Sequence, residues 1–383
     1  MARLAAASHA RDVTGTLSDR LRRRIALAGP IAVSAYMAEA LGDPEHGYYM
    51  TRDPLGTAGD FTTAPEISQM FGELIGLWCA EVWRQAGGPK TVRLIELGPG
   101  RGTLMADLLR AARMAPDFAD ALSVHLVETS PVLTARQRTT LDRRQVQWHD
   151  RLDDVPDGPA LIVANEFFDA LPIHQLQRDA SGWRERMVGL DENGAGFRFG
   201  LAPVASPLEA LIPESVRRVA RPGDLFELCP AGIGIARAIG RRIADQGGAA
   251  LLIDYGHAES ATGDTLQAVR AHRYCDPLDD PGSADLTAHV DFAILARAAS
   301  EAGATAHGPV TQGEFLSRLG IGARAETLLR RATPAQAEDI RAACRRLIGP
   351  EEMGTLFKAL ALTSASAPPP PGFMQDSESS PRP

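Results

Sequence analysis

The sequence predicts an α/β protein built on a parallel, doubly wound sheet. Short apolar runs alternate with amphipathic helical stretches through the middle of the chain, and several of these runs end in glycines or acids. Such alternation is typical of parallel sheets that are covered by helices on both faces. With 383 residues the chain is long enough for two or three structural units, so its core needs no disulfide or metal.

The first part of the chain, residues 1–89, is predicted to be mainly helical and to cover a site. Apolar residues recur at helical spacing over three stretches, which are 18–28, 31–41 and 66–85. Between the second and third stretches, residues 42–65 are rich in proline and glycine and contain Tyr48, Tyr49 and Phe61. We expect this segment to be a loop that lies over the sheet.

Residues 90–173 and 246–362 are predicted to form the doubly wound domain. Five apolar runs are expected to be its strands, at 91–97, 123–128, 145–148, 160–164 and 249–256. Helical spacing predicts its helices at 103–112, 132–141, 283–297 and 334–347.

Two segments depart from this alternation. Residues 174–245 are predicted to be an inserted subdomain of β-hairpins followed by a helix, with Asn193-Gly194 as a hairpin turn. Residues 363–383 are rich in proline and serine and are predicted to be a disordered tail.

Charge and composition exclude several classes of protein. The net charge of −8 provides no basic surface for nucleic acid, and no apolar run reaches the ~18 residues that a membrane span needs. The four cysteines, Cys79, Cys229, Cys275 and Cys344, lie far apart, as expected for reduced thiols in a cytosolic protein. Residues 1–11 lack the apolar core of a secretory signal. Among 40 basic residues two are lysine, a bias typical of a high-GC bacterial genome.

The strongest chemical signal is the glycine-rich run that ends the first predicted strand. Glycines let a ligand approach the backbone, and the helix that follows offers free N–H groups. A dinucleotide fingerprint needs glycine at its first, third and sixth positions, but the sixth position counted from Gly98 is Thr103. The pattern Glu-x-Gly-x-Gly-x-Gly instead resembles the first motif of class I S-adenosyl-L-methionine methyltransferases. The cofactor candidates in this run are Glu96, Gly98, Pro99, Gly100 and Gly102.

Acids also end the next two predicted strands. Glu128 follows the second strand, where a carboxylate can accept hydrogen bonds from both hydroxyls of a ribose. Asp150 follows the third strand, at an edge that would face an adenine, and it would equally suit the cap of the next turn.

The fourth predicted strand ends in the run Asn165-Glu166-Phe167-Phe168-Asp169. Methyltransferases place the nucleophile at this point, and an amide or carboxylate there can hold it. A guanidinium stays charged, so carboxylates must orient it by charge-assisted hydrogen bonds. Glu166 is our first candidate for this role, with Asp169 as the alternative. Asn165 is a candidate for contact with both the acceptor and the cofactor. Helix capping by Asn165 and Asp169 remains the structural alternative.

These blocks closely resemble the MidA family, which comprises the mitochondrial complex I assembly-factor arginine methyltransferases and their bacterial homologues. The resemblance covers roughly residues 20–360. The runs that carry it are 36–49, 59–66, 96–104, 165–172, 253–257 and 285–292. The glycine loop is generic to methyltransferases, whereas the runs at 59–66 and 165–172 are specific.

The resemblance implies a Rossmann-like class I methyltransferase that forms symmetric dimethylarginine on a core subunit of respiratory complex I. It implies that Gly98, Gly100 and Gly102 hold the methionine part of S-adenosyl-L-methionine, that Glu128 holds the ribose, and that Phe61 lies against the target guanidinium. The expected location is the cytoplasm of a bacterium, or the mitochondrial matrix in a eukaryote. The expected partner is the protein substrate, and a homodimer stays open.

The chain departs from the pattern of arginine methyltransferases at one place. These enzymes generally carry a second glutamate along the hairpin that follows the first, where this sequence has His174 and Gln175. Asp169 or a residue from elsewhere would then complete the pair of acids. His257, His272 and His289 lie in separate blocks without ligand spacing, so no metal site is expected.

Two other functions stay open on the sequence. The chain could methylate an amine of a small molecule or nucleobase, although the net charge disfavours nucleic acid. It could also be an assembly chaperone for complex I that binds S-adenosyl-L-methionine without turning it over.

Overall fold

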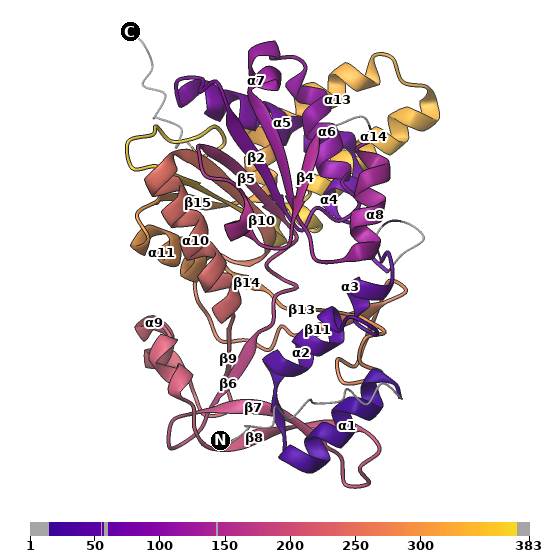
Figure 1. Ribbon diagram of the computed structural model, residues 1–383, viewed down its shortest axis with the longest axis vertical. Coiled ribbons are helices and arrows are strands. Elements are labelled where there is room, and N and C mark those ends of the chain that lie inside the picture. The colour runs from indigo at the N-terminus through magenta and orange to yellow at the C-terminus, as the bar shows by residue number, and fades with distance from the viewer. Residues whose placement is uncertain (1–14, 55, 57–59, 143–144, 374–383) are drawn as a thin grey trace, which may run out of the picture.

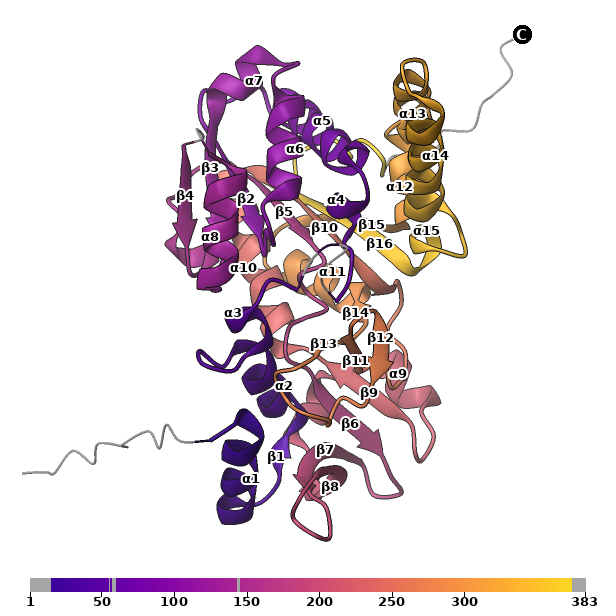
Figure 2. The same cartoon turned by 90° about the vertical axis from the view of Figure 1, so that its right-hand side faces the viewer.

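The computed structural model describes residues 15–54, 56, 60–142 and 145–373. The expectations for residues 1–11 and for residues 374–383 of the predicted tail lie outside these described residues. The chain forms a larger lobe around one sheet and a smaller lobe below it, and the segments that link them pass between the two (Figures 1 and 2).

An eight-stranded sheet forms the centre of the larger lobe (Figure 1). Its strands are β2 (Val92–Leu97), β3 (Leu122–Val127), β4 (Val146–His149), β5 (Ala160–Asn165), β10 (Gly248–His257), β14 (Val290–Asp291), β15 (Thr305–Thr311) and β16 (Phe357–Thr363). They lie in the order β15-β16-β10-β5-β2-β3-β4, with β14 beside β10. The strands from β10 to β4 are parallel, and β16 runs antiparallel to both of its neighbours, β10 and β15. This is the α/β, doubly wound class that the sequence predicts.

Helices cover both faces of this sheet because its strands are apolar on both sides. Leu94 and Leu161 face a core with α5 (Gln69–Gln85) and α6 (Thr103–Ala112), whereas Ile95 and Ile162 face α10 (Pro230–Gln246) and α11 (Phe292–Glu301). The other helices of this lobe are α4 (Ala64–Ile67), α7 (Pro116–Ala121), α8 (Pro131–Thr140), α12 (Gln312–Arg318), α13 (Ile321–Leu329), α14 (Pro334–Ile348) and α15 (Met353–Leu356), with a 3-10 turn at Leu152–Asp154.

The smaller lobe combines the N-terminal helices with the inserted strands. Its elements are α1 (Leu17–Ala28), β1 (Ile31–Ala32), α2 (Val33–Gly42), α3 (Tyr48–Thr51), β6 (His174–Arg178), β7 (Trp183–Leu190), β8 (Phe197–Ala205), a 3-10 turn at Pro207–Leu211, α9 (Glu214–Val219), β9 (Leu225–Leu228), β11 (Gln267–Arg270), β12 (Arg273–Cys275) and β13 (Asp285–Thr287). Tyr36, Val188 and Leu286 share one core. The regions predicted as a separate cover and a separate insertion therefore pack as one unit.

Two predicted N-terminal helices are wrong at their starts. Ile31 and Ala32 form β1, which pairs with Val188 and Met187 of β7. The helix predicted over 66–85 is divided at Ser68, whose extended backbone ends α4 and whose hydroxyl accepts the Met70 N–H to cap α5. In both places a tertiary or capping contact outweighs the helical spacing.

The helix predicted over 283–297 is also wrong at its start. Residues Asp285–Thr287 pair with β11 as strand β13, and Val290–Asp291 pair with β10 as β14. The helix begins at Phe292, where the Asp291 carboxylate accepts the Ile294 N–H at 3.0 Å. Strand pairing brings Asp285 to the sheet edge, which helical spacing alone does not indicate.

Two predicted boundaries of the insertion and the tail are corrected. Helix α10, which we assigned to the insertion, packs Ile239 and Ile243 against Ile95 of the large sheet. The segment from 364 to 373, predicted as disordered, packs on α5, because Trp78 Nε1 donates to the Pro371 carbonyl at 3.0 Å and Phe373 is buried.

The topology fixes where a ligand can bind. Strands β2 and β5 are neighbours, with Leu97 beside Ala164, and the chain continues to β3 on one side of the pair and to β10 on the other. Loops therefore leave these strands in opposite directions and open a crevice at their carboxyl ends.

Candidate active site

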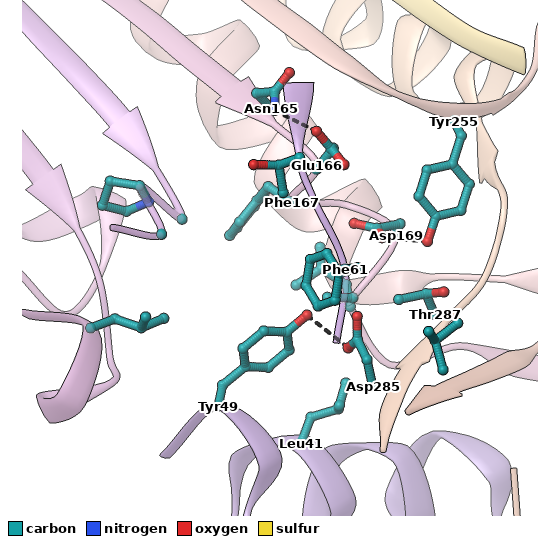
Figure 3. Close-up of a pocket in the computed structure, with 18 of the residues that line it drawn as sticks. Leu41, Tyr49, Phe61, Asn165, Glu166, Phe167, Asp169, Tyr255, Asp285 and Thr287 are labelled. Carbon is teal, nitrogen blue, oxygen red and sulfur yellow. Dashed lines mark hydrogen bonds between the residues drawn. The ribbon is translucent and has the colours of Figure 1, made fainter. Parts of the chain in front are cut away.

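A cavity of about 590 Å³ lies at this switch point, between the two lobes. Its walls are the glycine loop after β2, the ends of β3, β5 and β10, the segment from 61 to 66, and strand β13. Figure 3 shows side chains from these distant segments pointing into one space. The size suits a small-molecule cofactor together with one acceptor group.

The glycine loop forms one wall of the cavity. Gly98 and Gly100 line it with positive φ angles of 62° and 53°. A Cβ at Gly98 would lie 2.7 Å from Cδ2 of Phe167, so a larger residue would displace that ring. Pro99 also lines the cavity, whereas Gly102 lies behind it at the start of α6. Gly102 therefore shapes the turn and does not itself line the ligand space.

Glu96 lies under the loop and is 3% exposed. Its Oε2 atom is buried and makes no hydrogen bond within the described part of the chain. Burial and the nearby Glu128 raise the pKa of Glu96 to about 8. A cationic ligand group at this wall would supply the missing partner and favour the ionised form.

Glu128 is held at the end of β3 by two donors. The Ser130 N–H donates to Oε1 at 2.8 Å, and Gln137 Nε2 donates to Oε2 at 3.0 Å. The fully buried Gln137 also donates to the Gly100 carbonyl and accepts from Trp148 Nε1. Gln137 thus ties Glu128 to the glycine loop, and nothing in its sequence context indicates this role.

Glu166 begins the loop after β5 with a φ of 50°, a left-handed conformation that is uncommon for glutamate. Its Oε1 atom accepts the Ala64 N–H at 2.8 Å and Asn165 Nδ2 at 3.0 Å. Burial and the neighbouring Asp169 raise the pKa of Glu166 to about 7. Such strain and such a pKa are typical of functional sites.

The rest of this loop is fixed by Asp254 at the end of β10. Its Oδ2 atom accepts the main-chain N–H groups of Phe167, Phe168 and Asp169 at 2.9 to 3.2 Å. Asp169 in turn accepts the Tyr255 hydroxyl at 2.6 Å. Asp254 and Tyr255 occur in the family run at 253–257, but their contacts with this loop emerge only in the fold.

A further acid, Asp285, reaches the cavity from β13 (Figure 3). It is 5% exposed, and burial together with Asp169 raises its pKa to about 8. Its Oδ1 atom accepts the Tyr49 hydroxyl at 2.7 Å. The sequence motif at 285–292 contains Asp285, but no spacing rule connects it with Glu166.

The N-terminal segment covers the cavity and contacts the glycine loop. Arg101 of that loop forms an ion pair with Asp53 at 2.9 Å, and the Thr103 hydroxyl donates to Glu66 at 2.5 Å. Phe61 of the same segment lines the cavity. The predicted cover over the sheet is therefore present as a set of direct contacts.

Asp150, a candidate from the sequence, lies elsewhere, and so do the two residues at the position of the missing second glutamate. Asp150 is exposed beyond the edge strand β4 and does not line the cavity. His174 contacts Glu185, and the buried Gln175 donates to Glu227 and Asp264, so both belong to the sheet of the smaller lobe. Strand β6 therefore contains no acid that could serve in place of the second glutamate.

The three histidines do not form one group. His289 lines the cavity and packs against Tyr255, whereas His272 lies in the turn between β11 and β12. His257 packs against His289 but does not itself line the cavity. Within the described residues, no set of three or more His, Cys, Asp or Glu side chains could hold a metal ion.

The residues around the cavity fit S-adenosyl-L-methionine. Glu128 can accept the ribose hydroxyls, Glu96 has an unpaired buried oxygen for a cationic group, and the Gly98–Gly100 turn allows close approach. The amino end of α6 supplies main-chain N–H groups for a carboxylate.

Known proteins are similar to this chain over most of its length. A family model described as S-adenosyl-L-methionine-dependent methyltransferase matches residues 74–310. The mitochondrial protein arginine methyltransferase NDUFAF7 homolog of Drosophila melanogaster is 41% identical, over 93% of this chain and 87% of its own. The mitochondrial protein arginine methyltransferase NDUFAF7 of Homo sapiens is 40% identical, over 89% of this chain and 82% of its own.

A solved structure extends this similarity to the fold. A protein from Burkholderia thailandensis, crystallised with S-adenosyl-homocysteine, superposes with a TM-score of 0.79 and 31% identity, over 94% of this chain and 92% of that one. The relatives found by sequence and the solved structure are both named as methyltransferases. The chain therefore belongs to this family of class I S-adenosyl-L-methionine-dependent methyltransferases, as the resemblance to MidA proteins implies.

Proposed function

We propose that this methyltransferase forms symmetric dimethylarginine on a core subunit of respiratory complex I. The names of the NDUFAF7 relatives support arginine in a protein as the acceptor. The complex I subunit as substrate and the symmetric product rest on the resemblance to the complex I assembly factors of the MidA family. No helix within the described residues is long and apolar enough to cross a membrane.

The charge of the cavity is the observation that carries the proposal. Among the described residues that line it, one is an arginine and six are acids, namely Glu66, Glu96, Glu128, Glu166, Asp169 and Asp285. Arg101 is already paired with Asp53. A cavity with this excess of carboxylates favours cationic ligands, and a sulfonium together with a guanidinium would compensate it.

The residues divide between the two ligands. The glycine loop, Glu96 and Glu128 would hold the cofactor, and Asn165, Glu166 and Phe61 would hold the acceptor. When bound, S-adenosyl-L-methionine supplies a methyl group that leaves its sulfur with the bonding electrons staying on sulfur, while the arginine nitrogen forms the new bond and loses one proton. Glu166 orients that nitrogen through its free oxygen, and its carboxylate can take the proton and pass it to water.

Phe61 would set the shape of the acceptor site. It lines the cavity from the same segment whose Ala64 N–H holds Glu166. An aromatic ring beside the guanidinium would restrict which nitrogen faces the methyl group, and this supports a symmetric product. Replacing Phe61 by leucine is expected to change the ratio of dimethylarginine isomers released by acid hydrolysis.

The location follows the relatives. The NDUFAF7 proteins are named as mitochondrial, so a eukaryotic chain would act in the matrix. A bacterial chain would act in the cytoplasm, where complex I subunits of its peripheral arm are assembled. A homodimer is compatible with the proposal but not required by it.

The experiment that tests the function uses the purified protein, tritiated S-adenosyl-L-methionine and lysate from a strain that lacks the gene. Label is counted in protein, nucleic acid and small molecules. We expect one labelled protein of complex I that releases symmetric dimethylarginine on hydrolysis. Label in a small molecule or nucleic acid would replace the proposal with another amine methyltransferase. Cofactor binding without any label would favour the assembly chaperone.

A further inference from the structure

Two acids reach the acceptor side of the cavity from distant parts of the chain. Glu166 follows β5 in the larger lobe, whereas Asp285 lies on β13 of the smaller lobe. Figure 3 shows both side chains among those that line the cavity, with the phenol of Tyr49 hydrogen-bonded to Asp285. Burial and Asp169 raise the pKa of Asp285 most, and Glu166 adds a smaller repulsion.

Each of these carboxylates is held through one oxygen and leaves the other available. Glu166 uses Oε1 for the Ala64 N–H and the Asn165 amide, and Asp285 uses Oδ1 for the Tyr49 hydroxyl. The described residues make no hydrogen bond to the second oxygens, Oε2 of Glu166 and Oδ2 of Asp285, and both residues line the cavity. Both acids can therefore accept hydrogen bonds from a ligand without losing their supports.

Asp169 lies nearby, and its side chain is held by its own hydrogen-bond network. Its Oδ2 atom accepts the Tyr255 hydroxyl at 2.6 Å, and its Oδ1 atom is buried without a hydrogen-bond partner among the described residues, although Asp169 lines the cavity. Its loop is fixed by three N–H bonds to Asp254, so the side chain cannot turn without breaking this network. We therefore assign Asp169 to the support of the loop that contains Glu166.

We propose that Asp285, held by Tyr49, is the second carboxylate of the acceptor site and pairs with Glu166 around one guanidinium. This inference rests on the proposed function. A guanidinium is planar and has five N–H donors, so two carboxylates on different edges fix its plane and compensate its charge. In this proposal Asp285 has the role of the second glutamate on the hairpin, but it lies on a strand about 120 residues after Glu166.

Tyr49 acts as a positioning residue that also contacts the cofactor side. Its hydroxyl donates to Asp285, and its main-chain carbonyl accepts the Ser130 hydroxyl at 2.6 Å. The Ser130 N–H donates to Glu128, the candidate ribose ligand. One tyrosine thus connects the acid of the acceptor site with the acid of the cofactor site.

The test compares Asp285→Asn with Asp245→Asn, an exposed aspartate on α10 that serves as the matched control. The amide can still accept the Tyr49 hydroxyl, so folding should be preserved, and a thermal melt checks this. We expect the initial rate of tritium transfer to protein arginine to fall about 100-fold, because one charged hydrogen-bond acceptor is lost. The affinity for S-adenosyl-homocysteine should stay within threefold, and Asp285→Glu should recover at least tenfold of the rate.

A second variant covers the case in which Asp285→Asn unfolds. Tyr49→Phe removes one hydroxyl, and we expect an approximately tenfold loss of transfer with an unchanged affinity for S-adenosyl-homocysteine. The inference would be overturned if Asp285→Asn kept a rate within threefold of the control, or if it lost cofactor affinity to the same degree as rate. If Asp285→Asn does not fold, an unchanged rate of Tyr49→Phe would overturn it instead.

The same assay separates this inference from the proposed function. If the unaltered protein transfers no label to protein arginine, the proposed function fails before any variant is measured. If the unaltered protein methylates arginine and Asp285→Asn does so equally well, only the assignment of Asp285 fails.

Discussion

Glu166 combines three properties that rarely occur together in one residue. Its backbone is left-handed, its carboxyl group is held by the Ala64 N–H and Asn165, and its pKa is raised to about 7 by burial and Asp169. A glutamate that served packing alone would adopt none of these at such cost. Mutation of Glu166 is therefore the most direct single test of the acceptor site.

Glu166→Gln should lower the rate of methyl transfer by at least about 100-fold, because a neutral amide neither orients a guanidinium by charge nor takes a proton. Binding of S-adenosyl-homocysteine, measured by calorimetry, should stay unchanged. Since the pKa of Glu166 is about 7, the unaltered enzyme should lose kcat/KM as the pH falls below about 7. Glu192→Gln, in an exposed turn, is the control. A normal rate of methyl transfer in Glu166→Gln would show that Glu166 does not act on the acceptor.

Gln137 is predicted to support the cofactor site without touching the acceptor. Gln137→Ala would remove this partner from the Gly100 carbonyl and from Trp148 Nε1 and would leave Glu128 with the Ser130 N–H, and we expect the free energy of unfolding to drop by about 2 kcal/mol. The affinity for S-adenosyl-homocysteine should fall as well. Chemical denaturation and calorimetry measure the two effects. The exposed Gln147→Ala on β4 should show neither.

At the scale of elements, helix α10 shows how close packing depends on one small residue. A Cβ at Gly240 would lie 2.5 Å from the carbonyl oxygen of Ala299 in α11, whereas Gly234 of the same helix has no atom within 4 Å of such a position. The two helices together cover the face of the sheet that contains Ile95. Contact between α10 and α11 therefore requires glycine at one position and not at the other.

Gly240→Ala and Gly234→Ala are a matched pair on one helix. Gly240→Ala should destabilise the protein by about 1 to 3 kcal/mol, because the helices must move apart. Gly234→Ala should instead stabilise it by up to about 1 kcal/mol, since alanine has the higher helix propensity. Urea denaturation followed by circular dichroism measures both. Equal effects of the two substitutions would contradict the packing seen between these helices.

At the scale of the whole molecule, the cavity lies where the two lobes meet. The N-terminal segment contacts the glycine loop through Asp53 and Glu66, while the smaller lobe supplies Asp285. A ligand that fills the cavity touches both lobes and should stabilise their association. Binding and folding are coupled through this arrangement.

S-adenosyl-homocysteine at 100 times its Kd should stabilise the protein by about 2.7 kcal/mol. Hydrogen exchange should slow in α3 and at the start of α6, because the segment over the glycine loop is held closed. Asp53→Ala should weaken the protection of α3, since it removes the ion pair with Arg101. Protection confined to α6 would mean that the cover does not respond to the cofactor.

The acids of the cavity also predict how stability depends on pH. Glu96 has an ordinary pKa of 4.5 and a folded-state pKa of about 8, so the folded chain keeps a proton that the unfolded chain releases. The free energy of unfolding should therefore decrease as the pH rises from about 4.5 to about 8. Glu96→Gln should flatten this slope and make the variant the more stable protein above pH 8. Denaturation curves at several pH values measure the difference, and an unchanged slope would contradict the buried state of Glu96.

The sequence by itself determined the local features of this protein. The alternation of apolar runs and helices predicts the parallel strands, and the glycine run from Glu96 to Gly102 predicts the cofactor loop because close backbone approach needs glycine. Glu128 and Glu166 could be found for the same reason, since carboxyl ends of neighbouring parallel strands meet at one sheet edge. These features depend on residues that are close along the chain.

Tertiary structure alone decided which distant residues share the cavity. Asp285, Tyr49 and Gln137 come from β13, α3 and α8, and their hydrogen bonds exist only after the strands have paired. Pairing with β11 converts residues 285–287 from a predicted helix into a strand, and the edge position of β4 leaves Asp150 exposed beyond the larger sheet. Periodicity records which face of an element is buried. It does not record which element lies opposite, because that depends on packing over the whole molecule.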